Sequence, residues 1–405
     1  MNILKFVNSL KARVLKQEPL DQFQWKSVQS KSIIPMKEYA NRRSAVMQNK
    51  VEPIVLFANN SIMYSGHVKI PFKQNSSFYY LTASDLPDAI AVLVPTRFSF
   101  DYHMFITSQD PFSPPLDPPT ECKIHPIAEF SNFIKKLNPK FVYTNHPPTN
   151  TLFPHSIQQR WKLYTDPIPF KPLNLDKYRV IKSTAEIECI RKASELNASI
   201  MNHIMSNKYD NEHDVVVDIN YLSLQYNLNL SFIPVVASGT NTVFPHYQQN
   251  NMPIHKRDPL VVDFGVTIDN YCSDMTRSWQ VKETKVYQEL LSKLQTIQSE
   301  LIQMATIKNS IDSLEIHCKT LLHEHFPFAP IHTICPHPIS HHIGLCLHDV
   351  PTISTSQKLN ANNVITIEPG VYFPPSKDIP REYWGYGLRI EDVVVVNATS
   401  TILTK

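Results

Sequence analysis

Four acidic residues lie within, or at the end of, apolar runs that favour buried β-strands. The runs read LVVDFGV, SDMTRSW, NVITIEPG and RIEDVVVV, and their acids are Asp263, Asp274, Glu368 and Glu391. A buried carboxylate is costly unless it is paired or bound to a metal. Arg389 could neutralise one of these acids but not four. Together with nearby histidines, the four acids therefore predict a centre that holds more than one metal ion.

The first two acids belong to the segment LVVDFGVTIDNYCSDMTRSW, which predicts a hairpin with its turn at IDN. If the turn centres on Ile268 and Asp269, then Asp263 and Asp274 lie directly opposite each other. Like charges in that arrangement are destabilising, and a divalent cation between them would reverse the sign. The alternatives are two exposed aspartates on a polar hairpin face, or a register that a bulge has shifted.

The stretch HPISHHIGLCLHD, residues 337–349, carries the histidines His337, His341, His342 and His348. Carboxylate-rich ligation suits hard ions such as manganese, while a histidine ligand also admits iron, cobalt or zinc. Glycine is scarce, with seven in 405 residues, and five of them flank these histidines and acids. A glycine retained in such a chain indicates positive φ or a close approach of the backbone.

The composition narrows the class of protein. A length of 405 residues suits two domains, and a hydrophobic fraction of 42% suits packed cores. The net charge of +3 gives no electrostatic footprint for nucleic acid. No apolar run approaches the roughly 20 residues that span a bilayer, so we expect no membrane span. The six cysteines are scattered without a CxxC pair, which argues against a zinc finger and a disulfide framework.

The order of the apolar patterns indicates an α/β (α+β) fold in two parts. Ser183 and Glu186 form a capping-box signature, and apolar residues at helical spacing follow it. We therefore place a domain boundary near residue 175, with domains at 31–175 and 176–405. In the first domain we expect one helix and four buried strands of a mixed sheet, at residues 38–48 and at 53–59, 89–95, 104–108 and 141–145.

Residues 1–30 begin with MNILKFVNSLKARVLKQ, which has four basic residues and no acid. On a helical wheel its apolar residues form one stripe, and most of the positive charge lies away from it. A basic, acid-free amphipathic helix at the N-terminus is typical of a mitochondrial targeting segment, which predicts a mitochondrial location. The alternative is an ordinary N-terminal helix of a folded domain.

The acid and histidine segments resemble the metal-site motifs of the pita-bread metallopeptidases, which include aminopeptidase P, prolidase and methionine aminopeptidase. The resemblance covers essentially the whole chain, since FYYLTASDLPDAIAVLVP resembles the N-terminal domain of aminopeptidase P and prolidase. It is nearest to mitochondrial Xaa-Pro aminopeptidases and intermediate cleaving peptidases, whose pattern CPHPISHHIGLCLHDVP and PREYWGYGLRIEDVVVV carry. It implies an N-terminal mixed-sheet domain followed by a pita-bread catalytic domain.

The resemblance also implies a role for each site residue. It maps five metal ligands, in type and order, onto Asp263, Asp274, His341, Glu368 and Glu391. It implies that His337 and His348 polarise the scissile carbonyl and that Glu368 carries a proton to the leaving amine. It implies substrate-binding roles for Arg389 and for His246, which lies in SGTNTVFPHY. His342 has no such role and is interpreted as a packing residue.

The implied activity is release of the N-terminal residue from peptides or imported proteins at two divalent metal ions. Manganese is the expected ion, proline is the preferred second residue, and the resemblance admits a homodimer. Two alternatives stay open. A Xaa-Pro dipeptidase (prolidase) would use the same centre with a closed pocket end. A non-catalytic binding protein on this fold should have lost ligands, and all five are present.

Overall fold

A computed structural model describes residues 32–60, 63–65, 68–69, 72–107, 122–145 and 168–405. The chain separates into two compact units, residues 1–32 and 33–405. The predicted targeting segment, residues 1–30, lies outside the described residues. The boundary near residue 175 stays a prediction.

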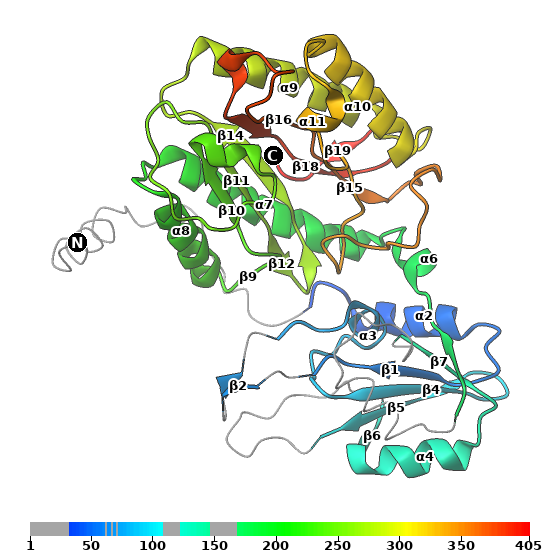
Figure 1. The fold of residues 1–405 in the computed structure, drawn as a ribbon. Coiled ribbons are helices and arrows are strands. Elements are labelled where there is room, and N and C mark those ends of the chain that lie inside the picture. The colour runs from blue at the N-terminus through cyan, green and yellow to red at the C-terminus, as the bar shows by residue number, and fades with distance from the viewer. Residues whose placement is uncertain (1–31, 61–62, 66–67, 70–71, 108–121, 146–167) are drawn as a thin grey trace. The chain divides into compact units, whose positions relative to one another are not determined.

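The described residues between 33 and 179 make up the first part of the larger unit. They contain a six-stranded sheet with the order β6-β5-β4-β1-β7-β8 (Figure 1). Antiparallel pairs join β1 to β4 and β4 to β5, whereas β6, β7 and β8 are added in parallel. The predicted mixed sheet is therefore confirmed. The strands are β1 (Ile54–Phe57), β4 (Ile90–Pro95), β5 (Phe100–Ile106), β6 (Lys123–Pro126), β7 (Val142–Thr144) and β8 (Phe170–Pro172).

Both faces of this sheet are covered by helices, which explains why its central strands are apolar throughout. Successive strand residues point to opposite faces, so Val55 and Phe57 pack with Phe130 of α4. Ile54 and Leu56 pack with α2 and α3 on the other face. The remaining elements of this part are α2 (Met36–Met47), β2 (Met63–Ser65), β3 (Val68–Lys69), α3 (Ser76–Thr82), η1 (Ile127–Glu129), α4 (Phe130–Leu137) and α6 (Asp176–Arg179).

The second part of this unit, residues 180–405, contains two helix pairs and four small groups of strands. Its helices are α7 (Thr184–Ser206), α8 (Glu212–Gln225), η2 (Gly239–Val243), α9 (Lys285–Met304), α10 (Ile311–His325), α11 (Ile331–Ile334) and η3 (Arg381–Tyr383). Its strands are β9 (Asn229–Leu230), β10 (Val235–Ser238), β11 (Leu260–Phe264), β12 (Val266–Ile268), β13 (Tyr271–Cys272), β14 (Met275–Trp279), β15 (Val364–Ile367), β16 (Gly370–Phe373), β17 (Tyr386–Arg389), β18 (Asp392–Val395) and β19 (Thr401–Ile402).

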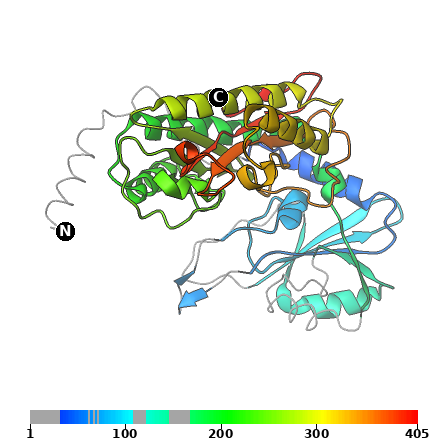
Figure 2. The same ribbon diagram turned by 45° about the horizontal axis from the view of Figure 1, so that its top comes forward.

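Each helix pair packs against its own strands through a separate apolar core. Helices α7 and α8 bury residues such as Ile200 and Ile219 against β10, β11 and β14. Helices α9 and α10 bury Leu294 and Leu314 against β15, β16, β17 and β18. The two pairs flank the strands in both ribbon views (Figures 1 and 2). The strands that carry the predicted ligands are therefore held from two sides.

Helix α7 begins where the capping-box signature predicts. The Ser183 side chain accepts from Glu186 N, and the Glu186 side chain accepts from Ser183 N. Glu186 has a second role that the local pattern does not reveal, because its carboxylate also accepts from Tyr271 Oη at 2.8 Å. Arg42 of α2 lies 3.5 Å from the same carboxylate. The start of α7 therefore ties the first part of the chain to the β12–β13 hairpin.

The predicted register of the acidic hairpin is wrong by two residues. Asp263 pairs with Thr276, not with Asp274. The turn centres on Asp269 and Asn270, which both have positive φ, as a two-residue hairpin turn that follows strand twist requires. Moving the turn by one residue shifts the partners by two and keeps each side chain on its face. Asp263 and Asp274 are therefore diagonal neighbours on one face.

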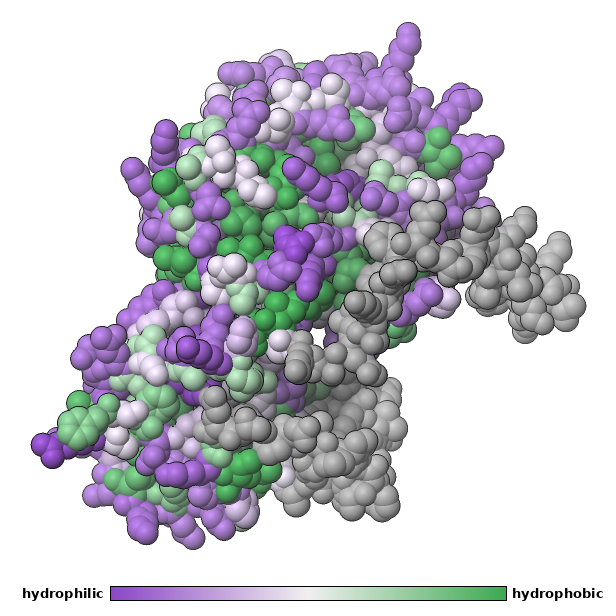
Figure 3. Space-filling model, turned by 180° about the vertical axis from the view of Figure 1, so that it is seen from behind, coloured by the Kyte–Doolittle hydropathy of each residue, from purple (hydrophilic) through white to green (hydrophobic). Residues whose placement is uncertain are grey.

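The surface is mixed rather than uniformly apolar. On the face opposite to that of Figure 1, hydrophobic residues gather over part of the molecule and hydrophilic residues surround them (Figure 3). Among the described residues, no helix has the length and apolar character needed to cross a membrane.

Candidate active site

The predicted ligands come from strand ends that meet in the second part of the chain. Asp263 lies in β11, Asp274 directly before β14, and Glu391 directly before β18. Glu368 follows β15, and the His341 segment pairs with that strand through Thr366 N and the His341 carbonyl, at 2.9 Å. Ligands from four separate regions of sequence are therefore positioned by backbone pairing.

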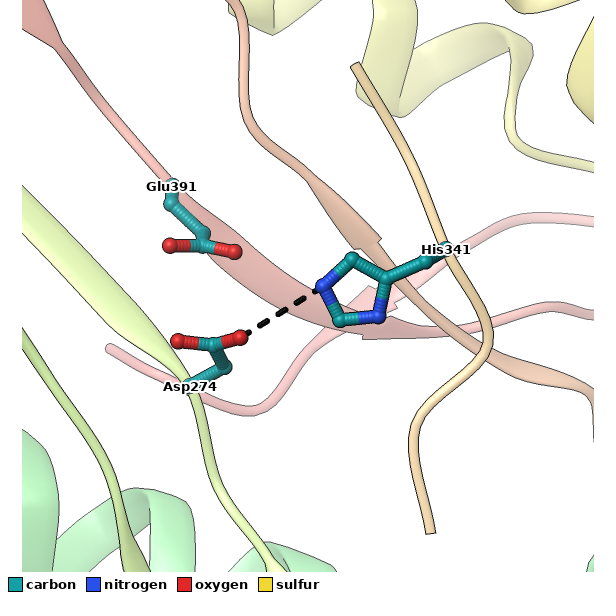
Figure 4. Close-up of side chains that lie close together, drawn as sticks. All are labelled: Asp274, His341 and Glu391. Atoms are coloured by element: carbon teal, nitrogen blue, oxygen red, sulfur yellow. Dashed lines mark ion pairs between the residues drawn. The ribbon is translucent and has the colours of Figure 1, made fainter. Parts of the chain in front are cut away.

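Three of these side chains lie close enough to share one metal ion. Asp274, His341 and Glu391 each offer a ligand atom, and the three atoms lie within 4.8 Å of one another. Figure 4 shows the three side chains pointing toward each other, with the Asp274–His341 ion pair dashed. His341 Nε2 lies 3.5 Å from Asp274 Oδ2 and 3.4 Å from Glu368 Oε1. The convergence joins four of the five predicted ligands.

His341 is oriented for ligation through Nε2. Its other ring nitrogen, Nδ1, lies 3.1 Å from the His342 carbonyl oxygen. A carbonyl accepts only, so Nδ1 carries a proton, and Nε2 is the ring nitrogen that faces the acids. Metal-binding histidines commonly have one ring nitrogen anchored in this way.

The fifth predicted ligand, Asp263, forms an ion pair with Arg389. Its Nη2 donates to Asp263 Oδ2 at 2.6 Å, and its Nε donates to Thr276 Oγ1 at 3.1 Å. Thr276 in turn donates to Glu391 Oε2 at 2.7 Å. One carboxylate oxygen of Asp263 is therefore paired with arginine, while Asp274 has no ion-pair partner except His341 among the described residues.

The three other predicted histidines differ in how firmly they are held. His337 Nδ1 lies 2.8 Å from the Pro338 carbonyl oxygen, and its Nε2 lies 2.9 Å from Tyr372 Oη. The His348 ring packs edge-on against His341, with centroids 4.4 Å apart. No hydrogen bond to another described residue holds the ring nitrogens of His348 or His246. These two rings can therefore offer a donor to substrate without first breaking a bond.

The pKa values of the buried acids and histidines report the balance of charge. Burial raises the pKa of Asp263 to about 6, against the opposing effect of Arg389, and that of Glu368 to about 7. Burial alone would lower the pKa of His341, but Asp274 and Glu368 raise it to about 9. Burial, followed by Arg389, lowers the pKa of His337 to about 4. Burial is the largest cause of the shift in both acids, so the site disfavours ionised carboxylates unless a cation joins them.

The donor set fits divalent metal ions. Asp263 Oδ1, Asp274 Oδ1 and Glu391 Oε1 are buried and have no hydrogen-bond partner among the described residues. Unpaired buried carboxylate oxygens are strongly unfavourable in a folded protein. A cation among them would offset both the missing partners and the like charge. One imidazole with several carboxylates is a donor set for hard or borderline ions.

These groups line one cavity of about 750 Å³. All the predicted site residues contribute to its wall: Asp263, Asp274, His246, His337, His341, His348, Glu368, Arg389 and Glu391. Apolar side chains, among them Phe232, Val235 and Leu347, form another part of the wall. The polar groups therefore converge in a cavity that also offers apolar surface to a ligand, as binding sites for small molecules and peptides do.

Sequence reasoning missed two residues of this site. Tyr372 Oη accepts from Arg389 Nη1 at 2.8 Å and bonds His337, so it links the two. Thr276 links Arg389 to Glu391. Strand alternation could have suggested Thr276, because it lies two residues after Asp274 and shares its face. Nothing local marks Tyr372, whose partners come from other segments.

His342 also lines the cavity, and its interpretation as a packing residue stays a prediction. It is buried and its backbone forms an isolated bridge with Ile365. Burial and the charge of Lys182 lower its pKa to about 4. A neutral, buried imidazole held through its backbone fits a structural role.

Comparison with known families identifies the protein class. Residues 188–398 match the model of metallopeptidase family M24, a range that includes the four acids and every histidine of the site. The chain belongs to metallopeptidase family M24. Residues 39–114 match the aminopeptidase P N-terminal domain. The family resemblance inferred from the motifs is confirmed.

Known relatives of this M24 peptidase align along most of its length. Intermediate cleaving peptidase 55 of Saccharomyces cerevisiae is 26% identical and covers 98% of this chain and 88% of its own. Xaa-Pro aminopeptidase 3 of Homo sapiens is 26% identical, with coverage of 90% and 82%. The Arabidopsis thaliana protein "Intermediate cleaving peptidase 55, mitochondrial" is 27% identical, with coverage of 90% and 79%.

The fold is shared with a solved structure. The Saccharomyces cerevisiae Icp55 structure bound to apstatin inhibitor superposes with a TM-score of 0.80, at 24% identity, and covers 92% of this chain and 95% of its own. This confirms the predicted mixed α/β architecture with a pita-bread part. Family and relatives together make this M24 protein a metal-dependent aminopeptidase.

Proposed function

We propose that this M24 peptidase releases the N-terminal residue from peptides or imported proteins at a centre of two divalent metal ions. The observation that carries the proposal is the convergence of four carboxylates and His341 on one cavity. Three of the carboxylate oxygens there have no other partner among the described residues. The family resemblance adds a preference for proline in the second position.

We assign the ligand roles as the motifs imply. Asp263, Asp274, His341, Glu368 and Glu391 would hold the ions. The grouping of Asp274, His341 and Glu391 supports this assignment. When bound, the ions supply Lewis acidity and a nucleophilic water at neutral pH.

The chain's own residues supply the remaining chemistry. Glu368 is the proposed proton carrier, taking a proton from the attacking water and delivering it to the leaving amine. His246 and His348 donate hydrogen bonds to the oxygen that gains negative charge. His337 contributes when the substrate carbonyl replaces the Pro338 carbonyl as the partner of its Nδ1–H.

Arg389 is the proposed substrate-binding cation, and it also keeps the site rigid. It bonds Asp263, Thr276, Tyr372 and the Pro245 carbonyl oxygen. A guanidinium with four partners has a fixed plane. It can therefore hold the histidines and the acids at constant separation while substrate binds.

A second cavity favours peptides longer than two residues. It has a volume of about 720 Å³ and shares His337, Pro338 and Ser340 with the first cavity. The four predicted ligand acids line the first cavity and not the second. The acids of the second cavity are Asp312 and Glu315. A peptide whose N-terminus lies at the metal ligands can extend past His337 into this space. A prolidase would instead close the cavity behind the second residue.

The test compares substrates and metal states of the full chain. The purified protein, loaded with manganese, is given Xaa-Pro dipeptides, longer Xaa-Pro peptides and matched Xaa-Ala peptides. We expect single N-terminal residues to be released, fastest from longer Xaa-Pro peptides. Chelation should abolish activity, and manganese or cobalt should restore it. Turnover by metal-free protein, or cleavage of dipeptides alone, contradicts the proposal.

Manganese and a mitochondrial location are the finer parts of the proposal. Carboxylate-rich ligation supports manganese, and metal analysis of protein purified without added metal tests it. The basic N-terminal stretch supports import, as does the mitochondrial name of the Arabidopsis relative. Residues 1–30 fused to a fluorescent protein should reach mitochondria, whereas a matched fusion with Lys5, Lys11, Arg13 and Lys16 replaced by glutamine should not. A cytosolic wild-type fusion refutes this.

A homodimer is the proposed assembly, and it rests on the family resemblance alone. Light scattering during size-exclusion chromatography measures the mass directly. Two chains per particle are expected, and a particle with the mass of one chain excludes the dimer.

A further inference from the structure

The carboxylate of Glu212 is buried without any cation. Glu212 is the first residue of α8 and is 0% exposed. No ion pair joins it to a lysine, arginine or histidine in the part of the chain that the structure describes. A buried charge of this kind is strongly unfavourable unless hydrogen bonds replace its water. Its partners therefore indicate what the protein uses it for.

Five donors surround the two carboxylate oxygens. Oε1 accepts from Ser238 N at 2.7 Å, from Ser238 Oγ at 2.9 Å and from Asn241 Nδ2 at 3.1 Å. Oε2 accepts from Tyr247 Oη at 2.9 Å and from Met252 N at 3.0 Å. Every donor is neutral, and bonds to an ionised acceptor are about twice as strong as neutral ones. The carboxylate is therefore the hub of this network.

All five donors belong to one segment, from Ser238 to Met252, and His246 lies inside it. Tyr247 follows His246 directly and is buried, while the His246 side chain lines the active-site cavity. On the other side of His246, the Pro245 carbonyl oxygen accepts from Arg389 Nη1 at 3.2 Å. Both sequence neighbours of His246 are thus held by charged side chains, although its own ring has no described partner.

We propose that Glu212 is a positioning residue that sets the place of His246 through Tyr247. The inference rests on the proposed role of His246 as a donor to the reacting carbonyl. Glu212 has no contact with the cavity, so it acts only by holding the backbone on either side of Tyr247. A displacement of about 1 Å in such a group can lower turnover by roughly 10²-fold.

The decisive variant is Tyr247→Phe, which removes one hydroxyl and leaves the other four donors in place. We expect kcat to fall by about tenfold, within the loss that a misplaced group produces, with two metal ions still bound. Glu212→Gln should reduce kcat further. The glutamine NH2 group can only donate, whereas the neighbours of this position are all donors. Asp214→Asn, on the same turn of α8, is the matched control and should leave kcat unchanged.

A double-mutant cycle with His246→Ala separates positioning from general loss of structure. If Tyr247 acts through His246, adding Tyr247→Phe to His246→Ala should change kcat by less than about twofold, since residues acting as a unit are not additive. Independent, multiplying effects would overturn the inference. So would loss of metal from Tyr247→Phe.

A crystal structure of Tyr247→Phe provides a readout that does not depend on activity. The inference requires the His246 imidazole to move or to lose its single position. An unmoved ring overturns it even where the proposed peptidase activity is present. Conversely, a displaced ring in a protein without aminopeptidase activity supports the positioning role and refutes only the proposed function.

Discussion

Lys182 Nζ donates to Asp349 Oδ2 at 2.9 Å, and both side chains are only 1% exposed. Arg179 bonds the other oxygen of the same carboxylate. Asp349 follows His348, whereas Lys182 and Arg179 precede α7. The cluster of two cations and one anion therefore fixes the His348 loop to the start of the catalytic part.

Replacing the single anion should cost more than replacing one of the two cations. Asp349→Asn leaves two buried cations without a carboxylate, and breaking a buried pair in this way costs about 3–5 kcal/mol. Lys182→Met leaves Arg179 paired with Asp349, so its loss should be smaller. Urea denaturation of both variants measures the difference. Equal losses would show that Arg179 does not hold Asp349 alone.

The same cluster predicts a dependence of stability on pH. Burial by itself would raise the pKa of Asp349, but Lys182 and Arg179 hold it below its ordinary value. A depressed pKa adds stability above the unfolded value of roughly 3.9. That contribution is lost as pH falls through the folded pKa. The free energy of unfolding should thus decline more steeply below about pH 4 in wild type than in Asp349→Asn, and parallel curves would refute this.

The four histidines of residues 337–349 should separate into three classes. His341→Ala should lower metal occupancy, because it removes the imidazole from a site of acids. His337→Ala and His348→Ala should keep the metal and reduce kcat by roughly 10²–10³. His342→Ala should cause only a modest loss of stability. Metal analysis beside kinetics decides, and an emptied site in His348→Ala with both ions kept in His341→Ala would reverse the ligand assignment.

The close pairing of the two strands that carry Asp263 and Asp274 should require a glycine at position 265. A Cβ at this position would lie 1.9 Å from the Ser273 carbonyl oxygen, which is far inside the contact distance. Gly265→Ala must therefore push the two strands apart, and we expect lower metal affinity as well as lower stability. Thr267→Ala in the adjacent strand is the control. Unchanged metal binding in Gly265→Ala would show that the hairpin tolerates the shift.

The register of that hairpin shows how far local pattern extends. The apolar run before Asp263 and the polar turn were sufficient to predict two paired strands. The partner of Asp263 was wrong, because Asp269 and Asn270 both adopt positive φ and move the turn by one residue. The prediction that both acids share a face survived, since a shift of two residues preserves the face.

The sequence by itself determined the chemical content of the site. The apolar strands, the capping box at Ser183 and the acids in buried runs are each set by residues within a few positions of one another. Those short-range patterns were sufficient to predict the mixed sheet, the start of α7 and a cluster of buried acids, and the motifs were sufficient to infer the family.

Only the tertiary structure decided which oxygen meets which partner. Arg389 and Asp263 are 126 residues apart, and Tyr247 and Glu212 are 35 apart. Such pairs depend on where strands and helices cross after packing, and hydrogen bonds form only within about 3 Å. A pattern of residue types in the sequence does not specify which atoms come within that distance. The roles of Tyr372 and Glu212 therefore became visible only when the fold brought their partners together.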